Sequence, residues 1–108
     1  MFRCKGCGYI DDERAPDVCP KCGAKKDAFL QLADDAAELI DKSRCTNFIH
    51  MEIASLANSI LALSESGIEE NLDPNCVKLF NYAYDQSTII KQMINAELEG
   101  HMNKKKWG

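Results

Sequence analysis

The sequence predicts a small metal-bound knuckle domain followed by an all-α helical hairpin that dimerises into a four-helix bundle. Two observations lead to this prediction. Four of the six cysteines form two Cys-x-x-Cys pairs near the N-terminus, and two long amphipathic stretches follow them in the 108-residue chain. The composition changes at about residue 32, which divides the chain into a metal-binding domain (1–32) and an antiparallel two-helix hairpin with a short basic tail (33–108).

Each Cys-x-x-Cys pair is expected to fold as a tight knuckle that offers two thiolates to one ion. The predicted metal ligands are Cys4, Cys7, Cys19 and Cys22. A glycine follows each pair and allows backbone angles that a side chain would oppose. Four thiolates form a tetrahedral site that suits zinc or iron. About thirty residues are too few for a hydrophobic core, so the metal is expected to take the place of one.

The sequence around both knuckles resembles that of rubredoxins. The first knuckle, FRCKGCGYIDD at residues 2–12, has an aromatic residue before the cysteines and Gly-Tyr after them. The second, CPKCGAKKDAF at residues 19–29, has its lysine and phenylalanine at the offsets seen in that family. Eleven residues separate Cys7 from Cys19, which is shorter than in a full rubredoxin. This short form, with Ala15-Pro16 before the second knuckle, resembles the rubredoxin-like domain at the C-terminal end of rubrerythrins.

The resemblance implies a mononuclear Fe(Cys)₄ centre with one iron per chain. Such a centre would pass single electrons to and from a redox partner protein. The cysteine spacing by itself leaves zinc open, because both metals accept four thiolates. With zinc, the knuckle would be structural and the protein an interaction module whose helices bind a partner.

Residues 33–108 are expected to form two helices. Asp34 and Asp35 place acidic side chains at a helix start, where the macrodipole favours them, and Gly67 indicates where this helix stops. Asp73-Pro74 indicates an N-cap followed by proline at the first helical position. A loop of about six to ten residues between the helices would make them antiparallel neighbours.

Both helices carry a stripe of regularly spaced side chains. On the first helix the stripe is Leu39, Ile49, Ile53, Leu56, Ile60 and Leu63. On the second helix it is Cys76, Phe80, Ala83, Ser87, Ile90, Ile94, Glu97 and His101. Two helices cannot enclose a core, so the remaining apolar positions predict a homodimer, with a lone coiled-coil hairpin as the alternative.

A second metal site is a further hypothesis. Rubrerythrins join such a domain to a four-helix bundle whose di-iron site uses Glu-x-x-His, a motif that this chain lacks. The nearest combination is Glu97 and His101, which an antiparallel hairpin would bring to face Glu38 and Lys42. These residues could bind metal as in a di-iron peroxide reductase, or could form a salt-bridged polar end of the bundle. We favour an electron carrier without its own catalytic centre over an enzyme.

Charge and composition exclude several classes of function. Residues 31–73 carry nine acidic side chains against two basic ones, and the three consecutive lysines 104–106 lie in the tail. This distribution argues against nucleic-acid binding. Without a membrane-spanning stretch or a signal peptide, the expected protein is soluble and cytoplasmic and does not bind membranes. Cys45 and Cys76 are expected to be buried thiols.

Overall fold

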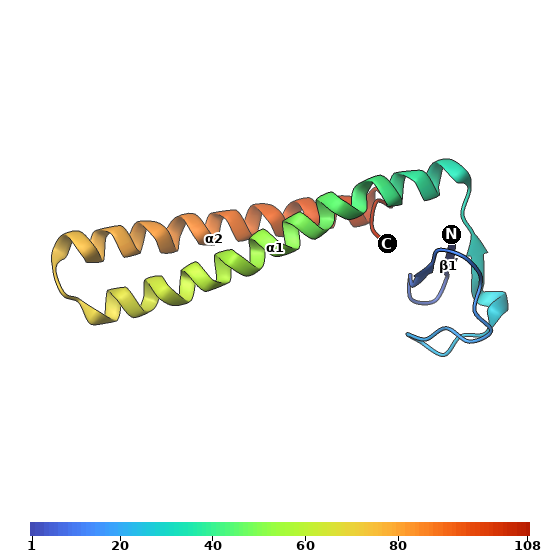
Figure 1. Cartoon of the computed structure of the whole chain (residues 1–108), viewed down its shortest axis with the longest axis horizontal. Coiled ribbons are helices and arrows are strands. Elements are labelled where there is room, and N and C mark those ends of the chain that lie inside the picture. The colour runs from blue at the N-terminus through green and yellow to red at the C-terminus, as the bar shows by residue number, and fades with distance from the viewer. The chain divides into compact units, whose positions relative to one another are not determined.

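A computed structural model describes all residues 1–108 and contains a small sheet followed by two long helices. The elements are β1 (Phe2–Cys4), β2 (Ile10–Asp11), the 3₁₀ turn η1 (Lys26–Ala28), β3 (Phe29–Gln31), α1 (Asp34–Glu70) and α2 (Pro74–Asn103), as Figure 1 shows. The predicted fold class, a four-cysteine knuckle domain followed by two helices, is confirmed. The chain forms two compact units, Met1–Cys45 with Lys104–Gly108, and Thr46–Asn103.

The sheet of the first unit is antiparallel, with β1 between β2 and β3. Its strands have two or three residues each, which is too few to build a hydrophobic layer. The side chains with the least exposure in the whole chain are Ile40, Cys4 and Cys19. Two of these three are predicted metal ligands, so the interior of this unit is largely the knuckle site itself.

Arg44 of α1 forms hydrogen bonds with two distant segments of the first unit. The Arg44 guanidinium donates to both carboxylate oxygens of Asp12, with Nη1–Oδ2 at 2.9 Å and Nη2–Oδ1 at 2.6 Å, and its Nε donates to the main-chain oxygen of Gly108 at 2.9 Å. Arg3 donates to the carbonyl of Trp107 at 2.8 Å. The hydrogen bond from Arg44 lowers the pKa of the Asp12 carboxyl below its usual value. The pair therefore stabilises the unit at any pH above the usual pKa of an aspartate, and this contribution is lost as the pH falls through the lowered pKa.

Carboxylates accept free main-chain N–H groups in the first turn of each helix. At the start of α1, the Asp35 carboxylate accepts the N–H of Ala36 at 2.8 Å. At the start of α2, the Asp73 carboxylate accepts the N–H of Cys76 at 2.9 Å, which confirms the predicted N-cap before Pro74.

The predicted stop at Gly67 and the predicted loop of six to ten residues are wrong. Helix α1 continues to Glu70, and the turn consists of Asn71–Asp73 alone. Asn71 takes the left-handed conformation, with φ of +49°, which asparagine adopts at helix C-termini more readily than most residues. Asn71 therefore ends the helix.

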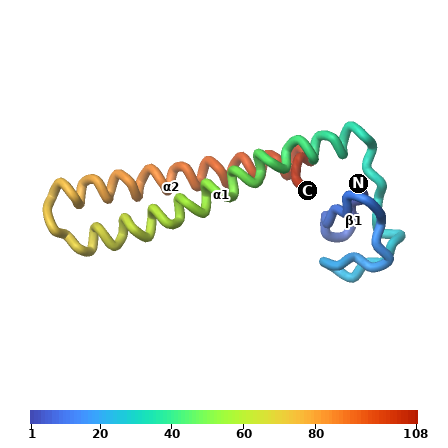
Figure 2. Tube along the Cα trace, in the orientation of Figure 1, coloured from blue at the N-terminus to red at the C-terminus, as the bar shows by residue number.

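Gly67 instead makes room for a neighbouring ring. A Cβ on Gly67 would lie 2.5 Å from Cδ2 of Phe80 in α2. Figures 1 and 2 show α2 running back antiparallel to α1 from the short turn. The glycine is thus required by helix–helix packing near the turn.

The side chains that the second unit buries between its helices are small or polar, except for Ile94. They are Asn47, Ala57, Ser64, Ser87, Ile94 and His101. The predicted apolar stripe of α1 is not the buried face, because its members from Ile49 to Leu63 are 42–71 % exposed. The predicted stripe of α2 is buried at Ser87, Ile94 and His101, whereas Ile90 is exposed. No membrane-spanning segment is found in either helix.

The two helical glycines form a matched pair for a stability test. A methyl group added at Gly100 would meet nothing within 4 Å, so Gly100→Ala should raise the free energy of unfolding by about 0.5–1 kcal/mol through helix propensity. Gly67→Ala gains the same propensity but forces the methyl against Phe80, and should lower stability by about 1–3 kcal/mol. Thermal and urea unfolding followed by circular dichroism would measure both. Equal stabilisation by the two substitutions would contradict the close packing at Gly67.

Candidate metal centre

The two knuckles have the same backbone structure. In the first, the N–H of Gly8 donates to the carbonyl of Cys4 at 2.9 Å, and in the second, the N–H of Gly23 donates to the carbonyl of Cys19 at 2.9 Å. Both glycines have positive φ, +77° and +76°. Residues with a side chain rarely adopt this conformation, so both glycines are needed for the turns.

The equivalence of the knuckles extends one residue further. The N–H of Cys4 donates to the carbonyl of Tyr9 at 2.8 Å, and the N–H of Cys19 donates to the carbonyl of Ala24 at 2.7 Å. The Tyr9 ring meets Phe29 of β3 edge-on, with ring centroids 6.5 Å apart. The main chain and this ring pair thus hold the knuckles in place around the sulfur atoms.

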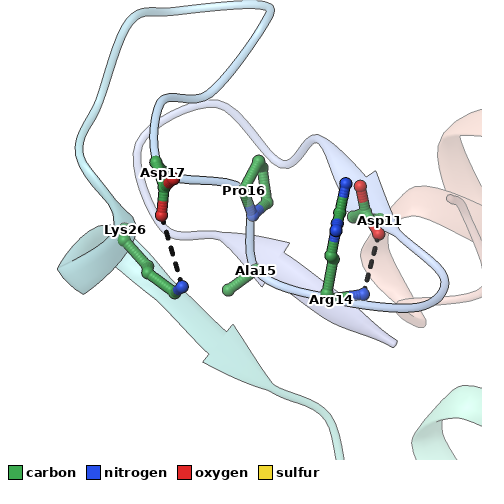
Figure 3. A pocket seen from close by; sticks show the side chains of 6 residues that line it. All are labelled: Asp11, Arg14, Ala15, Pro16, Asp17 and Lys26. Carbon is green, nitrogen blue, oxygen red and sulfur yellow. Dashed lines mark hydrogen bonds and ion pairs between the residues drawn. The ribbon is translucent and has the colours of Figure 1, made fainter.

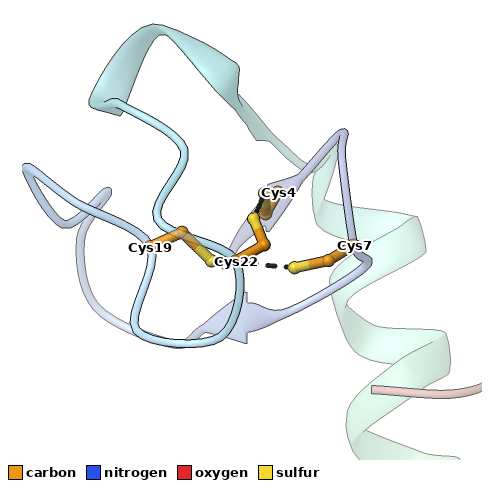
Figure 4. Close-up of side chains that lie close together, drawn as sticks. All are labelled: Cys4, Cys7, Cys19 and Cys22. Carbon is orange, nitrogen blue, oxygen red and sulfur yellow. Dashed lines mark hydrogen bonds between the residues drawn. The ribbon is translucent and has the colours of Figure 1, made fainter.

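The four predicted ligands converge. The Sγ atoms of Cys4, Cys7, Cys19 and Cys22 all lie within 4.8 Å of one another. Figure 4 shows these four side chains close together. The Cys4–Cys22 sulfurs are 3.7 Å apart and the Cys7–Cys19 sulfurs 3.6 Å apart. A tetrahedral ion with metal–sulfur bonds of about 2.3 Å separates its ligands by about 3.8 Å, whereas a disulfide needs about 2.05 Å. The donor set therefore fits a single metal ion.

The site is closed on one side and open on the other. Cys4 and Cys19, the first cysteine of each knuckle, are buried. Cys7 is half-buried and Cys22 is exposed. A bound ion would therefore have two sulfur ligands in the interior and two near the surface.

Hydrogen bonds shift the pKa values of Cys19 and Cys22 in opposite directions. Burial raises the pKa of Cys19, but hydrogen bonds from the N–H groups of Cys22 and Lys21 lower that pKa by more, to about 7. The N–H of Ala24 lowers the pKa of Cys22, but the sulfurs of Cys7 and Cys19 outweigh it and raise that pKa to about 12. The Cys19 thiolate thus forms readily near neutral pH, whereas the Cys22 thiolate needs a positive ion beside it.

Comparison with known proteins agrees with this geometry. The model of the family "Rubrerythrin, rubredoxin-like domain" matches residues 2–30. Residues 2–30 are a rubredoxin-like domain. The resemblance seen at the two knuckles is confirmed, and helices follow the rubredoxin-like domain as expected.

A relative extends the comparison. The chain is 43 % identical over 44 residues to reverse rubrerythrin-1 of Clostridium acetobutylicum. The matched segment covers 40 % of this chain and 24 % of the relative, so the chain spans about a quarter of that protein. No solved structure matches the chain. The similarity supports a metal-binding protein of redox type.

The residues predicted to form a second metal site have other partners. His101 is buried, with Nδ1 2.5 Å from Oδ1 of Asn47 and Nε2 3.1 Å from Oε1 of Glu97. Glu38 forms an ion pair with Lys42, one turn along α1. Both ring nitrogens of His101 are thus engaged, and a metal would have to displace one of their partners. The second site stays a prediction.

The two remaining cysteines differ from each other. Cys45 is exposed, so the prediction that it is a buried thiol is wrong. Cys76 is half-buried and its thiol donates to the Asp73 carboxylate at 3.1 Å. This hydrogen bond raises the pKa of Cys76 and disfavours the reactive thiolate.

A shallow hollow of about 290 Å³ lies beside the second knuckle, and Figure 3 shows its lining. The Asp11 carboxylate accepts the N–H groups of Glu13 and Arg14, at 3.1 and 2.9 Å. Asp17 pairs with Lys26 at 3.3 Å. These polar groups already have partners that shape the loop before the second knuckle, so the hollow is a structural feature of the rubredoxin-like domain.

Replacing one interior ligand should abolish metal binding. Cys19→Ser removes a buried sulfur and leaves three thiols, so we expect less than about a tenth of the wild-type metal content after purification. Cys45→Ser is the matched control, because Cys45 is exposed and lies outside the cluster. Elemental analysis of both variants would test this. Full metal content in Cys19→Ser would contradict the four-sulfur site.

Metal affinity should depend strongly on pH. Thiols must lose their protons to bind a metal, and below its pKa of about 7 the Cys19 thiol is itself largely protonated in the free site. Each displaced proton lowers the apparent affinity about tenfold per pH unit as the pH falls. Zinc titrations against a competing chelator between pH 5 and 7 would measure this slope. An affinity that does not change with pH would show that the ligands are not thiols.

Proposed function

We propose that this chain is a one-electron transfer protein that holds one iron through Cys4, Cys7, Cys19 and Cys22. The observation that carries the proposal is the convergence of four Sγ atoms, all within 4.8 Å, from two equivalent knuckles of a rubredoxin-like domain. Iron bound in such a site exchanges one electron between its ferric and ferrous states. The protein supplies the ligands, their fixed geometry and the surface through which electrons pass.

The backbone supports fast exchange because it fixes the sulfur positions. Two main-chain hydrogen bonds close each knuckle turn. Cys4 bonds to Tyr9 and to Gly8 in the first knuckle, and Cys19 bonds to Ala24 and to Gly23 in the second. These bonds do not involve the metal, so the ligand geometry changes little when the charge of the ion changes. A small reorganisation of the site favours electron transfer.

The open side of the site gives a redox partner protein a place to approach. Cys22 is exposed and Cys7 is half-buried. The Lys21 ammonium lies between the knuckles and donates to the carbonyl of Cys7 at 3.3 Å. A partner docked on this edge would come close to two of the four sulfurs, and the adjacent lysine would favour an acidic docking surface.

A structural zinc site is the second candidate function. The same sulfur separations fit zinc as well as iron, since both take four thiolates in tetrahedral geometry. The first unit also has few other buried side chains, which gives a metal of either kind a structural role. In this case the helices would be the functional part and would bind a partner.

A visible absorption spectrum with metal analysis on the same sample would separate these functions. Anaerobically purified protein from iron-supplemented cells should contain one iron per chain. It should be red from sulfur-to-iron charge transfer and should bleach when dithionite is added. Cys19→Ser should be colourless, because it lacks a ligand to the chromophore.

Other outcomes would redirect the proposal. A colourless protein with one zinc per chain from the same cells would contradict the proposal of electron transfer. More than one iron per chain in the wild type would indicate a second site. Additional iron that remains in Cys19→Ser and is lost in Glu97→Ala/His101→Ala would support the di-iron hypothesis instead.

A further inference from the structure

The second cysteines of the two knuckles differ in exposure, although the knuckles share one backbone structure. Cys22 is exposed, whereas Cys7 is half-buried. The matching main-chain hydrogen bonds and the matching turns at Gly8 and Gly23 would by themselves give these two sulfurs the same surroundings. The difference in exposure therefore comes from side chains near the sulfurs.

The residue before the second cysteine is glycine in one knuckle and lysine in the other. Gly6 precedes Cys7, and Lys21 precedes Cys22. A Cβ on Gly6 would lie 3.9 Å from Sγ of Cys22 and 3.9 Å from Sγ of Cys4. The Lys21 ammonium in turn reaches the first knuckle and donates to the carbonyl of Cys7 at 3.3 Å. Each of these two positions thus lies beside the second cysteine of the opposite knuckle.

Gly6 leaves its position open. The residue is exposed, and apart from its chain neighbours no atom other than the two sulfurs would lie within 4 Å of an added Cβ. A separation of 3.9 Å is an ordinary van der Waals contact, and Gly6 does not have positive φ. The local backbone therefore accepts a larger residue here. The effect of glycine at this position is to leave the Cys22 sulfur uncovered.

We propose that Gly6 forms an opening over the Cys22 sulfur through which the metal centre exchanges electrons, and that Lys21 closes the equivalent position over Cys7. The inference rests on the electron-transfer function proposed above. A one-electron redox partner contacts the Cys22 sulfur, and a single electron passes between the partner and the bound iron without any bond being formed or broken. Water at the opening also stabilises the negative charge of the reduced site, so Gly6 helps to set the reduction potential.

Alkylation of the zinc-loaded chain tests the opening without any electron transfer. A Cys45→Ser/Cys76→Ser background removes the thiols outside the site. With limiting iodoacetamide, peptide mapping by mass spectrometry should find Cys22 modified several-fold faster than Cys7, because the reactivity of a thiolate depends on its access to the reagent.

The matched control exchanges the residues at the two positions. Gly6→Lys/Lys21→Gly keeps the composition and the net charge but moves the opening to the other knuckle, so Cys7 should now react faster. Zinc content should not change, because neither residue is a ligand and neither has positive φ. If the exchanged chain loses zinc, Gly6→Ala should still slow the alkylation of Cys22. Equal alkylation of the two cysteines in the wild type would overturn the opening, as would an unchanged order in the exchanged chain.

Electron exchange is measured on the iron-loaded chain. Gly6→Val covers the Cys22 sulfur and should slow the oxidation of the dithionite-reduced protein by ferricyanide several-fold in stopped-flow experiments. It should also lower the reduction potential, because less water at the sulfurs destabilises the more negative reduced state. The exchanged chain, Gly6→Lys/Lys21→Gly, keeps one opening and should react at nearly the wild-type rate.

Two results would contradict the electron route in different ways. Wild-type oxidation rates in Gly6→Val would overturn exchange at the opening and leave the electron-transfer function intact. A wild type without reducible iron would overturn the proposed function, and with it the role of Gly6, whatever the alkylation pattern.

Discussion

Four thiol sulfurs within 4.8 Å of one another impose the constraint on which the first unit depends. The strands around them have two or three residues, and two of the three most buried side chains in the chain are the cysteines themselves. The pKa is lowered to about 7 at Cys19 but raised to about 12 at Cys22, so a positive ion beside them would favour the thiolate of Cys22. The small sheet and the two knuckle turns position these sulfurs. A metal bound at these four sulfurs would thus stabilise the fold of this unit, whichever ion it is.

The second unit differs from the first in the kind of side chains that hold it together. Its helices meet through small and polar groups such as Ala57, Ser64 and the hydrogen-bonded Asn47–His101 pair. Small side chains allow the helices to approach, as at Gly67 beside Phe80, but they remove little apolar surface from water. A buried polar pair contributes more to register than to stability, because it is satisfied in only one alignment. The packing therefore fixes how the two helices are aligned, but it removes little apolar surface from water.

The two units differ in how they relate to known proteins. Residues 2–30 match a rubredoxin-like domain, whereas the matched relative is about four times the length of the segment that it shares with this chain. The rubredoxin-like domain holds all four cysteines of the candidate metal site in a segment that is too short to contain a second functional site of similar size. What the helices add is set by this chain's own residues. The contribution of the helices is to be sought at their apolar and uncharged positions, including residues 53–64.

Local sequence alone determined the knuckles and the helix starts. Cys-x-x-Cys-Gly and Asp73-Pro74 act within a few residues through backbone conformation and short hydrogen bonds, so their spacing is sufficient to predict them. The tertiary structure decided what depends on distant partners. It showed that the Phe80 ring occupies the space beside Gly67 and that Arg44 binds Asp12 across 32 positions. It also showed that α1 buries Asn47, Ala57 and Ser64 rather than its predicted apolar stripe. Periodicity identifies the faces of a helix, but only packing selects which face meets which neighbour.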